Sequence, residues 1–188
     1  MKTTFMSMVI LVITSTFCYA QFVKETSINA QIGYGLSAPY ESFDNVVDSG
    51  FYFEGELVLE VLSWFEIRPY FGGVFTNSNG KDIDNNPTLE KAETKAILLG
   101  GKMRVRAPIP YIAPYIEVGV GTSIGRFTTF AGFDNIEKSG VIFHIPYSLG
   151  LELGKNNGVD LGLSYYFQPS VRQYAGAFAI GVTFPVNL

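Results

Sequence analysis

The chain has 188 residues, of which 47% are apolar, 15% aromatic and only 16% charged, and its formal net charge is −4. This composition excludes an intrinsically disordered chain, and a single cysteine excludes a disulfide-rich one. Its acidic balance, with no basic stripe to neutralise phosphates, argues against a nucleic-acid partner. The length predicts a single domain.

The first twenty residues have the features of an export signal. Lys2 provides a basic start, an apolar stretch follows over 5–13, and Cys18-Tyr19-Ala20 closes the segment. Small residues three positions and one position before the cut are typical of signal-peptide cleavage. The apolar stretch is shorter than the roughly 20 residues that a spanning helix needs. We therefore expect a cleaved signal peptide at 1–20 and a cysteine-free mature chain from Gln21, which suits an oxidising compartment.

From Thr26 onward, eight segments alternate apolar residues with polar or small ones, which is the two-residue period of a β-strand. The clearest runs from Phe51 to Leu62, where Phe53 and its neighbours two apart oppose a face that carries Glu54 and Glu56. The alternation recurs, in chain order, over 65–76, 115–125, 143–153 and 159–167. No stretch has a convincing helical period, so the chain is predicted to be all-β.

The predicted links between these strands alternate in length and polarity. Long polar links are expected at 39–49, 77–92 and 128–140, and tight ones at 63–65, 107–112 and 156–158. Short turns at one end of a sheet and long loops at the other are typical of an outer-membrane barrel.

Aromatic residues gather near the predicted strand ends, where two interfacial girdles are expected. Those near the long links are Phe51, Phe53, Phe75, Phe143 and Phe167, and those near the tight links are Trp64, Phe65 and Phe184. The opposite face of the strands is crowded with Gly, Ser and Glu. A narrow lumen needs small side chains and holds charge only where the charge is paired. These features favour a barrel whose apolar face meets lipid.

Strand arithmetic supports the same architecture. Eight strands of about ten residues, the length that crosses a bilayer at a tilt, use roughly half of the mature chain. We therefore predict an eight-stranded antiparallel up-and-down transmembrane β-barrel over 21–188, with both termini on the tight-turn side. Pro69 and Pro146 fall inside predicted strands, so each should mark a bulge or an unpaired ladder position.

The chain resembles the small eight-stranded outer-membrane barrels of the OmpA/OmpX-like group over 26–188. The resemblance rests on the export signal, the alternating segments, the stretch 114–121 (PYIEVGVG) and the terminal Gly181-Val182-Thr183-Phe184. It implies a barrel in the outer membrane of a Gram-negative envelope. It also implies insertion by the barrel-assembly machinery, which reads a last strand that usually ends in an aromatic residue. Here Phe184 precedes the end of the chain by four residues.

The inward face of the predicted barrel gathers eleven charged or titratable residues. These are Glu54, Glu56, Glu60, Glu66, Arg68, Lys102, Arg104, Glu117, His144, Glu152 and Asp160. A three-residue link at 63–65 predicts Glu60 opposite Arg68, and a two-residue turn at 109–110 predicts Lys102 opposite Glu117. Such pairs would plug the lumen and fix strand register. The alternative is a narrow cation-preferring pore, lined by the carboxylates that exceed the cations.

His144 raises the question of catalysis, because some outer-membrane barrels are hydrolases with a histidine near the outer rim. A three-residue loop at 156–158 predicts Ser170 across the ladder from His144. No carboxylate is obviously placed to orient the imidazole. A rim-sited hydrolase that uses His144 is therefore the further alternative, and no catalytic residue is assigned.

The longest polar link contains Asp82-x-Asp84-x-Asn86, with Glu93 where a calcium loop would close. Pro87 occupies the position that needs glycine for the sharp turn of such a loop. The two interpretations are a calcium loop and a plain acidic surface loop. No metal ligand is assigned.

The sequence as a whole predicts a non-enzymatic integral outer-membrane protein that supports the envelope or binds through its long loops. Expected partners are outer-membrane lipid, the barrel-assembly machinery and an extracellular ligand or protein, with no nucleic acid and no cofactor. The rival fold is a soluble periplasmic ligand-binding barrel with its apolar face turned inward, because alternation alone does not say which face is buried.

Overall fold

The computed structural model describes residues 23–40 and 46–186; the predicted signal peptide lies outside these ranges. The strands are β1 (Glu25–Pro39), β2 (Asp48–Leu62), β3 (Phe65–Asn77), β4 (Lys91–Arg106), β5 (Tyr111–Ala131), β6 (Asp134–Gly154), β7 (Val159–Gln168) and β8 (Gln173–Pro185). The 3-10 turn η2 (Pro169–Val171) lies between β7 and β8. No helix in the described part of the chain is long and apolar enough to cross a membrane.

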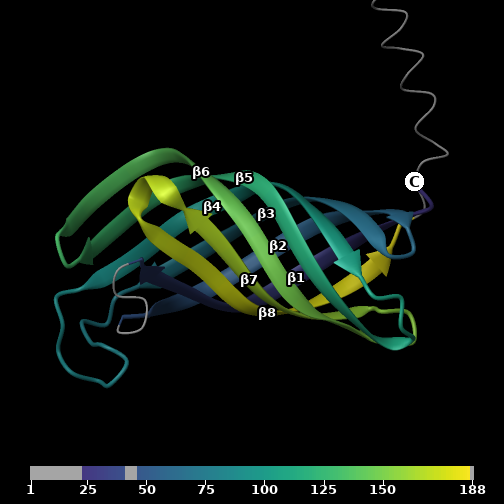
Figure 1. Ribbon diagram of the computed structural model, residues 1–188, viewed down its shortest axis with the longest axis horizontal. Helices are drawn as coiled ribbons and strands as arrows, with labels where there is room; N and C mark the ends of the chain where they lie inside the picture. The colour runs from purple at the N-terminus through teal and green to yellow at the C-terminus, as the bar shows by residue number, and fades with distance from the viewer. Residues whose placement is uncertain (1–22, 41–45, 187–188) are drawn as a thin grey trace, which may run out of the picture.

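Each strand pairs antiparallel with the next, and β8 closes the sheet onto β1, which gives a barrel with the strand order β1 to β8. Figure 1 shows the tight turns and the end of β8 at one end of the barrel, and the longer links at the other. Ser27 at the start of β1 lies opposite Pro185 at the end of β8. The predicted eight-stranded up-and-down barrel, with both ends of the sheet on the tight-turn side, is confirmed.

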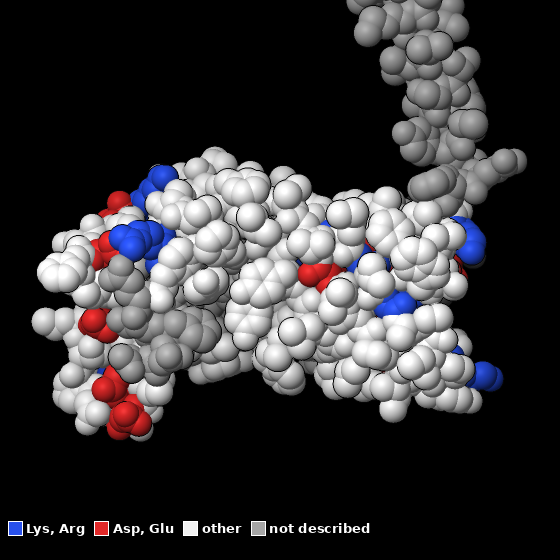
Figure 2. All heavy atoms as spheres, viewed as in Figure 1, with Lys and Arg blue, Asp and Glu red and all other residues white. Residues whose placement is uncertain are grey.

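The outer wall of the barrel is apolar. Ile116, Val118 and Val120 of β5 are 65%, 52% and 62% exposed, whereas the charged residues of the predicted lumen face the interior. In Figure 2 the wall between the two ends of the barrel is mainly white, and most charged atoms lie toward the ends. An exposed apolar belt of this extent marks a lipid-facing surface. The rival barrel with an apolar interior is therefore wrong.

Aromatic side chains stand at both edges of this belt. Phe51, Phe75 and Phe143 are exposed toward the long-link end, and Trp64 and Phe184 toward the tight-turn end. Aromatic rings are favoured at the two membrane–water interfaces, because they have an apolar body and tolerate the headgroup region. The two girdles define the height of the membrane-spanning wall.

The predicted long loop at 128–140 is wrong. β5 and β6 each run for 21 residues and continue past the barrel as a hairpin, in which Ala131 lies opposite Asp134. Gly132 makes the two-residue turn at a φ of +55°. Phe127 packs inward with Ile142 in a small apolar cluster, which anchors the hairpin to the barrel. Over 137–141 of β6 every residue is exposed, so the alternation that identified the other strands fades in this arm of the hairpin.

The prediction for both prolines is confirmed. The β2–β3 ladder is interrupted beside Pro69, between the pairs that contain Ile67 and Tyr70. The β5–β6 ladder is interrupted beside Pro146, between the pairs that contain His144 and Tyr147. Neither interruption shifts the register, because the missing N–H of proline removes only a local ladder bond.

The predicted pairing of Glu60 with Arg68 is wrong. Glu60 lies opposite Glu66, since a bulge shifts the register between Glu60 and Leu62 and the turn holds only residues 63 and 64. In a bulge, two residues of one strand lie opposite one residue of the other. The alternation of apolar and polar residues does not predict where a bulge occurs.

The predicted pairing of Lys102 with Glu117 is also wrong. Lys102 lies opposite Gly119, and Arg104 takes the place opposite Glu117. The last pair of the β4–β5 ladder is Arg106 with Tyr115, so the turn is centred between residues 110 and 111 instead of between 109 and 110. Each of these errors moves a pair by two residues along the ladder, so every side chain keeps its predicted face.

Candidate functional site

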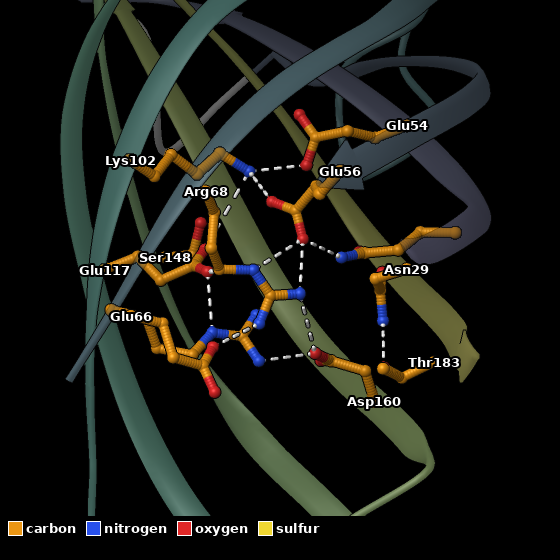
Figure 3. Close-up of polar contacts among 12 residues, drawn as sticks. Asn29, Glu54, Glu56, Glu66, Arg68, Lys102, Glu117, Ser148, Asp160 and Thr183 are labelled. Atoms are coloured by element: carbon orange, nitrogen blue, oxygen red, sulfur yellow. Dashed lines mark hydrogen bonds and ion pairs between the residues drawn. The ribbon is translucent and has the colours of Figure 1, made fainter. Parts of the chain in front are cut away.

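The interior of the barrel holds all eleven residues singled out in the sequence. Ten of them are 5% exposed or less, and Glu60 is half-buried at the tight-turn mouth. Nine of the ten form what we call the charged layer: Glu54, Glu56, Glu66, Arg68, Lys102, Arg104, Glu117, Glu152 and Asp160. Figure 3 shows the side chains it labels from this layer pointing toward one another across the lumen.

Arg68 binds the β2 and β3 side of the lumen. Its Nη2 and Nε donate to the same oxygen of Glu56 over 2.6 and 3.0 Å, and its Nη1 donates to Glu66 over 2.9 Å. A guanidinium presents several donors in a rigid fork, which suits two carboxylates at once.

Arg104 reaches across to β5, β6 and β7. Its Nε donates to Glu117, and its Nη1 donates to Glu152 and to Asp160, each over 2.7 Å. Its guanidinium lies 3.5 Å above the ring centre of Tyr115, whose hydroxyl donates to Asp160 over 2.5 Å. One side chain of β4 thus joins three other strands through the middle of the lumen.

Lys102 completes the layer. Its ammonium donates to Glu54 and, over 3.0 Å, to Glu56. Glu54 also accepts the hydroxyl of Tyr166 over 2.7 Å, and that hydroxyl lies 2.8 Å from the hydroxyl of Tyr52. The Lys102 ammonium stands 4.7 Å from the centre of a third tyrosine ring. Charge and aromatic rings together fill the cross-section, so the buried ions are paired and solvated by protein groups.

Arg106 is the functional candidate that the sequence reasoning missed. At the tight-turn mouth its Nη2 donates to Glu60 over 2.7 Å and its Nη1 to Glu152 over 2.8 Å. Arg106 follows Arg104 by two residues, as Arg104 follows Lys102, so the alternation of a strand places all three on the inward face. This spacing would have identified Arg106 from the sequence. With Arg106 included, the seven carboxylates face four cations.

A hollow of about 520 Å³ opens at the tight-turn end of the lumen. Glu60 and Arg106 line it, together with Glu152, Glu66 and Arg68 of the charged layer. Since the last two side chains are 2% and 1% exposed, the hollow ends blindly at the charged layer. It is a vestibule rather than a passage.

Toward the long-link end the lumen is closed by uncharged groups. We call this the neutral layer: Ser37, Thr76, Thr94, Ser123, His144, Gln168 and Gln173, each 1% exposed or less. Gln173 donates to Thr94 over 2.6 Å and to Gln168 over 3.0 Å, and Gln168 donates to Ser123 over 3.2 Å. Thr76 donates to Ser37 over 2.9 Å.

The predicted contact of His144 with Ser170 is wrong, because the last pair of the β6–β7 ladder is Leu153 with Val159. Five residues, 154–158, separate this pair instead of the three that the prediction assumed, and Ser170 lies in η2 beyond the ladder. The two ring nitrogens of His144 instead meet the Tyr70 hydroxyl at 2.5 Å and the Ser123 hydroxyl at 2.7 Å. Among the residues that the structure describes, no carboxylate bonds the imidazole, and the His144 side chain is fully buried. A histidine engaged on both nitrogens, away from any opening, is poorly placed for general base work.

Gly121 makes room for this contact. A Cβ at this position would lie 2.2 Å from the Tyr70 hydroxyl and 2.5 Å from Nε2 of His144. Both distances are far below van der Waals contact. The glycine on the lumen face of β5 is thus required by the crowding around the tyrosine and the histidine.

The Asp82 loop is shaped by its own hydrogen bonds. The Asp82 carboxylate accepts the backbone N–H groups of Asn86 and Asp84 over 2.8 and 2.9 Å. These bonds, that of Asn86 first, hold the pKa of Asp82 below its usual value. Within the described residues, no cluster of three His, Cys, Asp or Glu side chains is arranged to hold a metal ion. This geometry is that of a hydrogen-bonded turn in a surface loop.

Neither a protein-family model nor a curated protein matches the sequence. Among solved structures, the Neisserial surface protein A is similar with a TM-score of 0.57 and 10% identity, over 86% of this chain and 97% of that one. The outer membrane protein OprG of Pseudomonas aeruginosa reaches 0.49 and 12%, over 88% and 99%. The outer membrane enzyme PagL reaches 0.43 and 15%, over 83% and 99%.

Identities this low concern the fold alone. The chain has the fold of the small eight-stranded outer-membrane β-barrels, and the resemblance inferred from its sequence is confirmed at that level. The apolar outer wall makes it a membrane barrel protein. The likeness to PagL says nothing about activity in this chain.

Proposed function

We propose that this protein is a closed barrel of the outer membrane that supports the envelope and presents its long-link end at the cell surface for binding. The observation that carries the proposal is the charged layer, whose paired side chains fill the lumen from β2 to β7 at 5% exposure or less. A lumen filled in this way leaves the exposed ends as the surfaces available to a partner.

Placement in the outer membrane is supported by the apolar wall with its two aromatic girdles, by the export signal expected at 1–20, and by the fold. Outer-membrane lipid then surrounds the wall, and the barrel-assembly machinery inserts it. The surfaces for an extracellular ligand or protein are the 78–90 loop and the β5–β6 hairpin, which project at the same end (Figure 1).

The alternatives have less support. A cation-preferring pore needs continuous water, whereas the acidic vestibule ends at Glu66 and Arg68. A hydrolase needs an accessible histidine, whereas His144 is fully buried with both ring nitrogens bonded. We assign a catalytic role to no residue.

Cysteine labelling in whole cells tests the placement and the orientation. Lys81, in the 78–90 loop, and Lys155, in the tight turn after β6, are both exposed. A membrane-impermeant maleimide is expected to label Lys81→Cys in intact cells, and to label Lys155→Cys only after the outer membrane is permeabilised. The wild-type chain gives the background.

Equal labelling of the two variants in intact cells would contradict an outer-membrane orientation with the long links outside. Recovery of the wild-type protein in the soluble fraction would contradict membrane placement altogether.

A further inference from the structure

Two cations stand side by side on the outer wall where the apolar belt ends. Lys95 of β4 lies directly opposite Arg126 of β5, and both side chains are exposed on the outward face. One step closer to the membrane, Ile97 of β4 lies opposite Ile124 of β5, which lies opposite Val141 of β6. The cationic pair therefore sits at the boundary between lipid-facing and water-facing wall.

This pair is unfavourable in isolation, because like charges directly opposite on neighbouring strands destabilise a sheet. Within the described residues, neither Lys95 nor Arg126 makes an ion pair with a carboxylate. The nearest acidic residue on β4, Glu93, turns its carboxylate to the backbone N–H of Ser78, at 2.9 Å. Two adjacent cations that no carboxylate bonds directly indicate an anion from outside the protein.

The wall around the pair is hollowed. A recess of about 520 Å³ is lined by Lys95, Arg126 and Lys138, with Glu93 and Glu137 as the acidic members and Thr128 and Ser139 as hydroxyl groups. Cations are thus in the majority, and hydroxyl donors stand beside them. Phe75, exposed on β3, lies opposite Lys95 and places the pair at the level of the aromatic girdle.

We propose that Lys95 and Arg126 bind the phosphate groups of an anionic lipid in the leaflet at the long-link end of the barrel. Arginine can grip a phosphate with two parallel N–H bonds, and lysine adds a point charge. The acyl chains of the same lipid would lie along Ile97 and Ile124, directly beneath the cations. This continuity with the apolar wall favours a membrane lipid over a free phosphate ion.

The inference rests on the proposed membrane placement and names a lipid partner for it. The test uses the full mature chain, folded in phosphatidylcholine nanodiscs that contain a minor fraction of diphosphorylated lipid A. Bound lipid A is counted by native mass spectrometry. We compare the wild type with the Lys95→Gln, Arg126→Gln double variant and with Lys155→Gln, which removes a cation at the opposite end.

The double variant is expected to bind lipid A about thirtyfold more weakly than the wild type, given the usual contribution of two cations at a membrane surface. Lys155→Gln is expected to match the wild type. Equal retention by the double variant and the wild type would overturn the proposal. So would complete displacement of lipid A by inorganic phosphate, because the site would then recognise a free anion.

The heat-dependent gel shift of folded barrels separates this proposal from the one on which it rests. Wild-type protein that fails to insert into the nanodisc overturns the membrane placement and the lipid site together. Wild-type protein that inserts, shows the shift and binds lipid A no better than the double variant overturns the lipid site alone.

Discussion

The two halves of the lumen are closed by different chemistry. In the charged layer each cation serves several strands, as Arg104 does for Glu117, Glu152 and Asp160. In the neutral layer the contacts are single hydrogen bonds between uncharged groups, as between Gln168 and Ser123. A buried ion that loses its partner leaves an uncompensated charge, whereas a lost hydroxyl leaves a single unmade hydrogen bond. The half near the tight turns should therefore be far more sensitive to single substitutions.

The largest effect is expected from Arg104→Ala. Three carboxylates lose their shared cation inside a fully buried layer, and removing one partner of a buried ion pair costs about 3–5 kcal/mol. Equilibrium unfolding in urea from lipid vesicles measures the loss of free energy. A loss below about 1 kcal/mol, the ordinary effect of an exposed ion pair, would contradict a dry, paired layer.

A double-mutant cycle on Arg68 distinguishes the observed register from the one that the sequence suggested. Arg68→Ala combined with Glu56→Ala should show a coupling energy of about 1–3 kcal/mol, since the two groups share two hydrogen bonds. Arg68→Ala combined with Glu60→Ala should be close to additive, because Glu60 binds Arg106. The opposite ranking of the two couplings would show that the β2–β3 register is wrong.

Gly121→Ala should disturb the boundary between the two layers. Its methyl group would collide with Tyr70 and His144, and overpacking a filled interior costs about 1–3 kcal/mol. Gly101→Ala is the matched control, because a Cβ there meets no atom within 4 Å. We expect the control to change the unfolding free energy by no more than about 0.5 kcal/mol. Equal effects of the two variants would contradict the crowding.

Ser37→Ala samples the neutral layer alone. The Ser37 hydroxyl donates to Thr94 over 3.0 Å and accepts from Thr76. Its removal should cost about 1 kcal/mol, the usual net value of one internal hydrogen bond. A loss of unfolding free energy as large as that of Arg104→Ala would contradict the expected difference in sensitivity between the charged layer and the neutral layer.

The smallest effect concerns the loop outside the membrane. Hydrogen bonds from Asn86 and Asp84 lower the pKa of Asp82 in the folded loop, so their contribution is present above the unfolded pKa and is lost as the pH falls through the folded pKa. Carbon NMR of the Asp82 carboxyl group should give a titration midpoint below the ordinary aspartate range. A midpoint within that range would contradict the turn, and the barrel itself should not respond to this titration.

The sequence predicted the faces of the strands better than their partners. Glu60, Lys102 and His144 were each assigned a wrong cross-strand neighbour, and each error amounted to two residues along the ladder. The period of a strand is two, so such a shift leaves inward residues inward. Turn lengths and the bulge after Glu60 set the register, and neither can be predicted from the alternation of apolar and polar residues.

Two further features of the structure could not be predicted from the alternation of apolar and polar residues. In the β5–β6 hairpin, residues 137–141 of β6 are exposed on both faces, so the apolar period is lost there. The neutral layer uses Gln168 and Gln173, whose amides look like ordinary surface residues at a strand end until the barrel closes around them. Closure brings them within hydrogen-bond distance of Ser123 and Thr94 across the lumen.

Single-channel recording of the refolded mature protein in a planar bilayer tests the closed lumen most directly. The heat-dependent gel shift certifies that the protein is folded, and a known open barrel in the same membrane certifies the recording. We expect electrical silence from the wild type, because the charged layer and the neutral layer both block the passage of water. Steady cation-selective steps from folded protein would contradict the closed lumen and would make Glu54, Glu56 and Glu117 the residues to neutralise next.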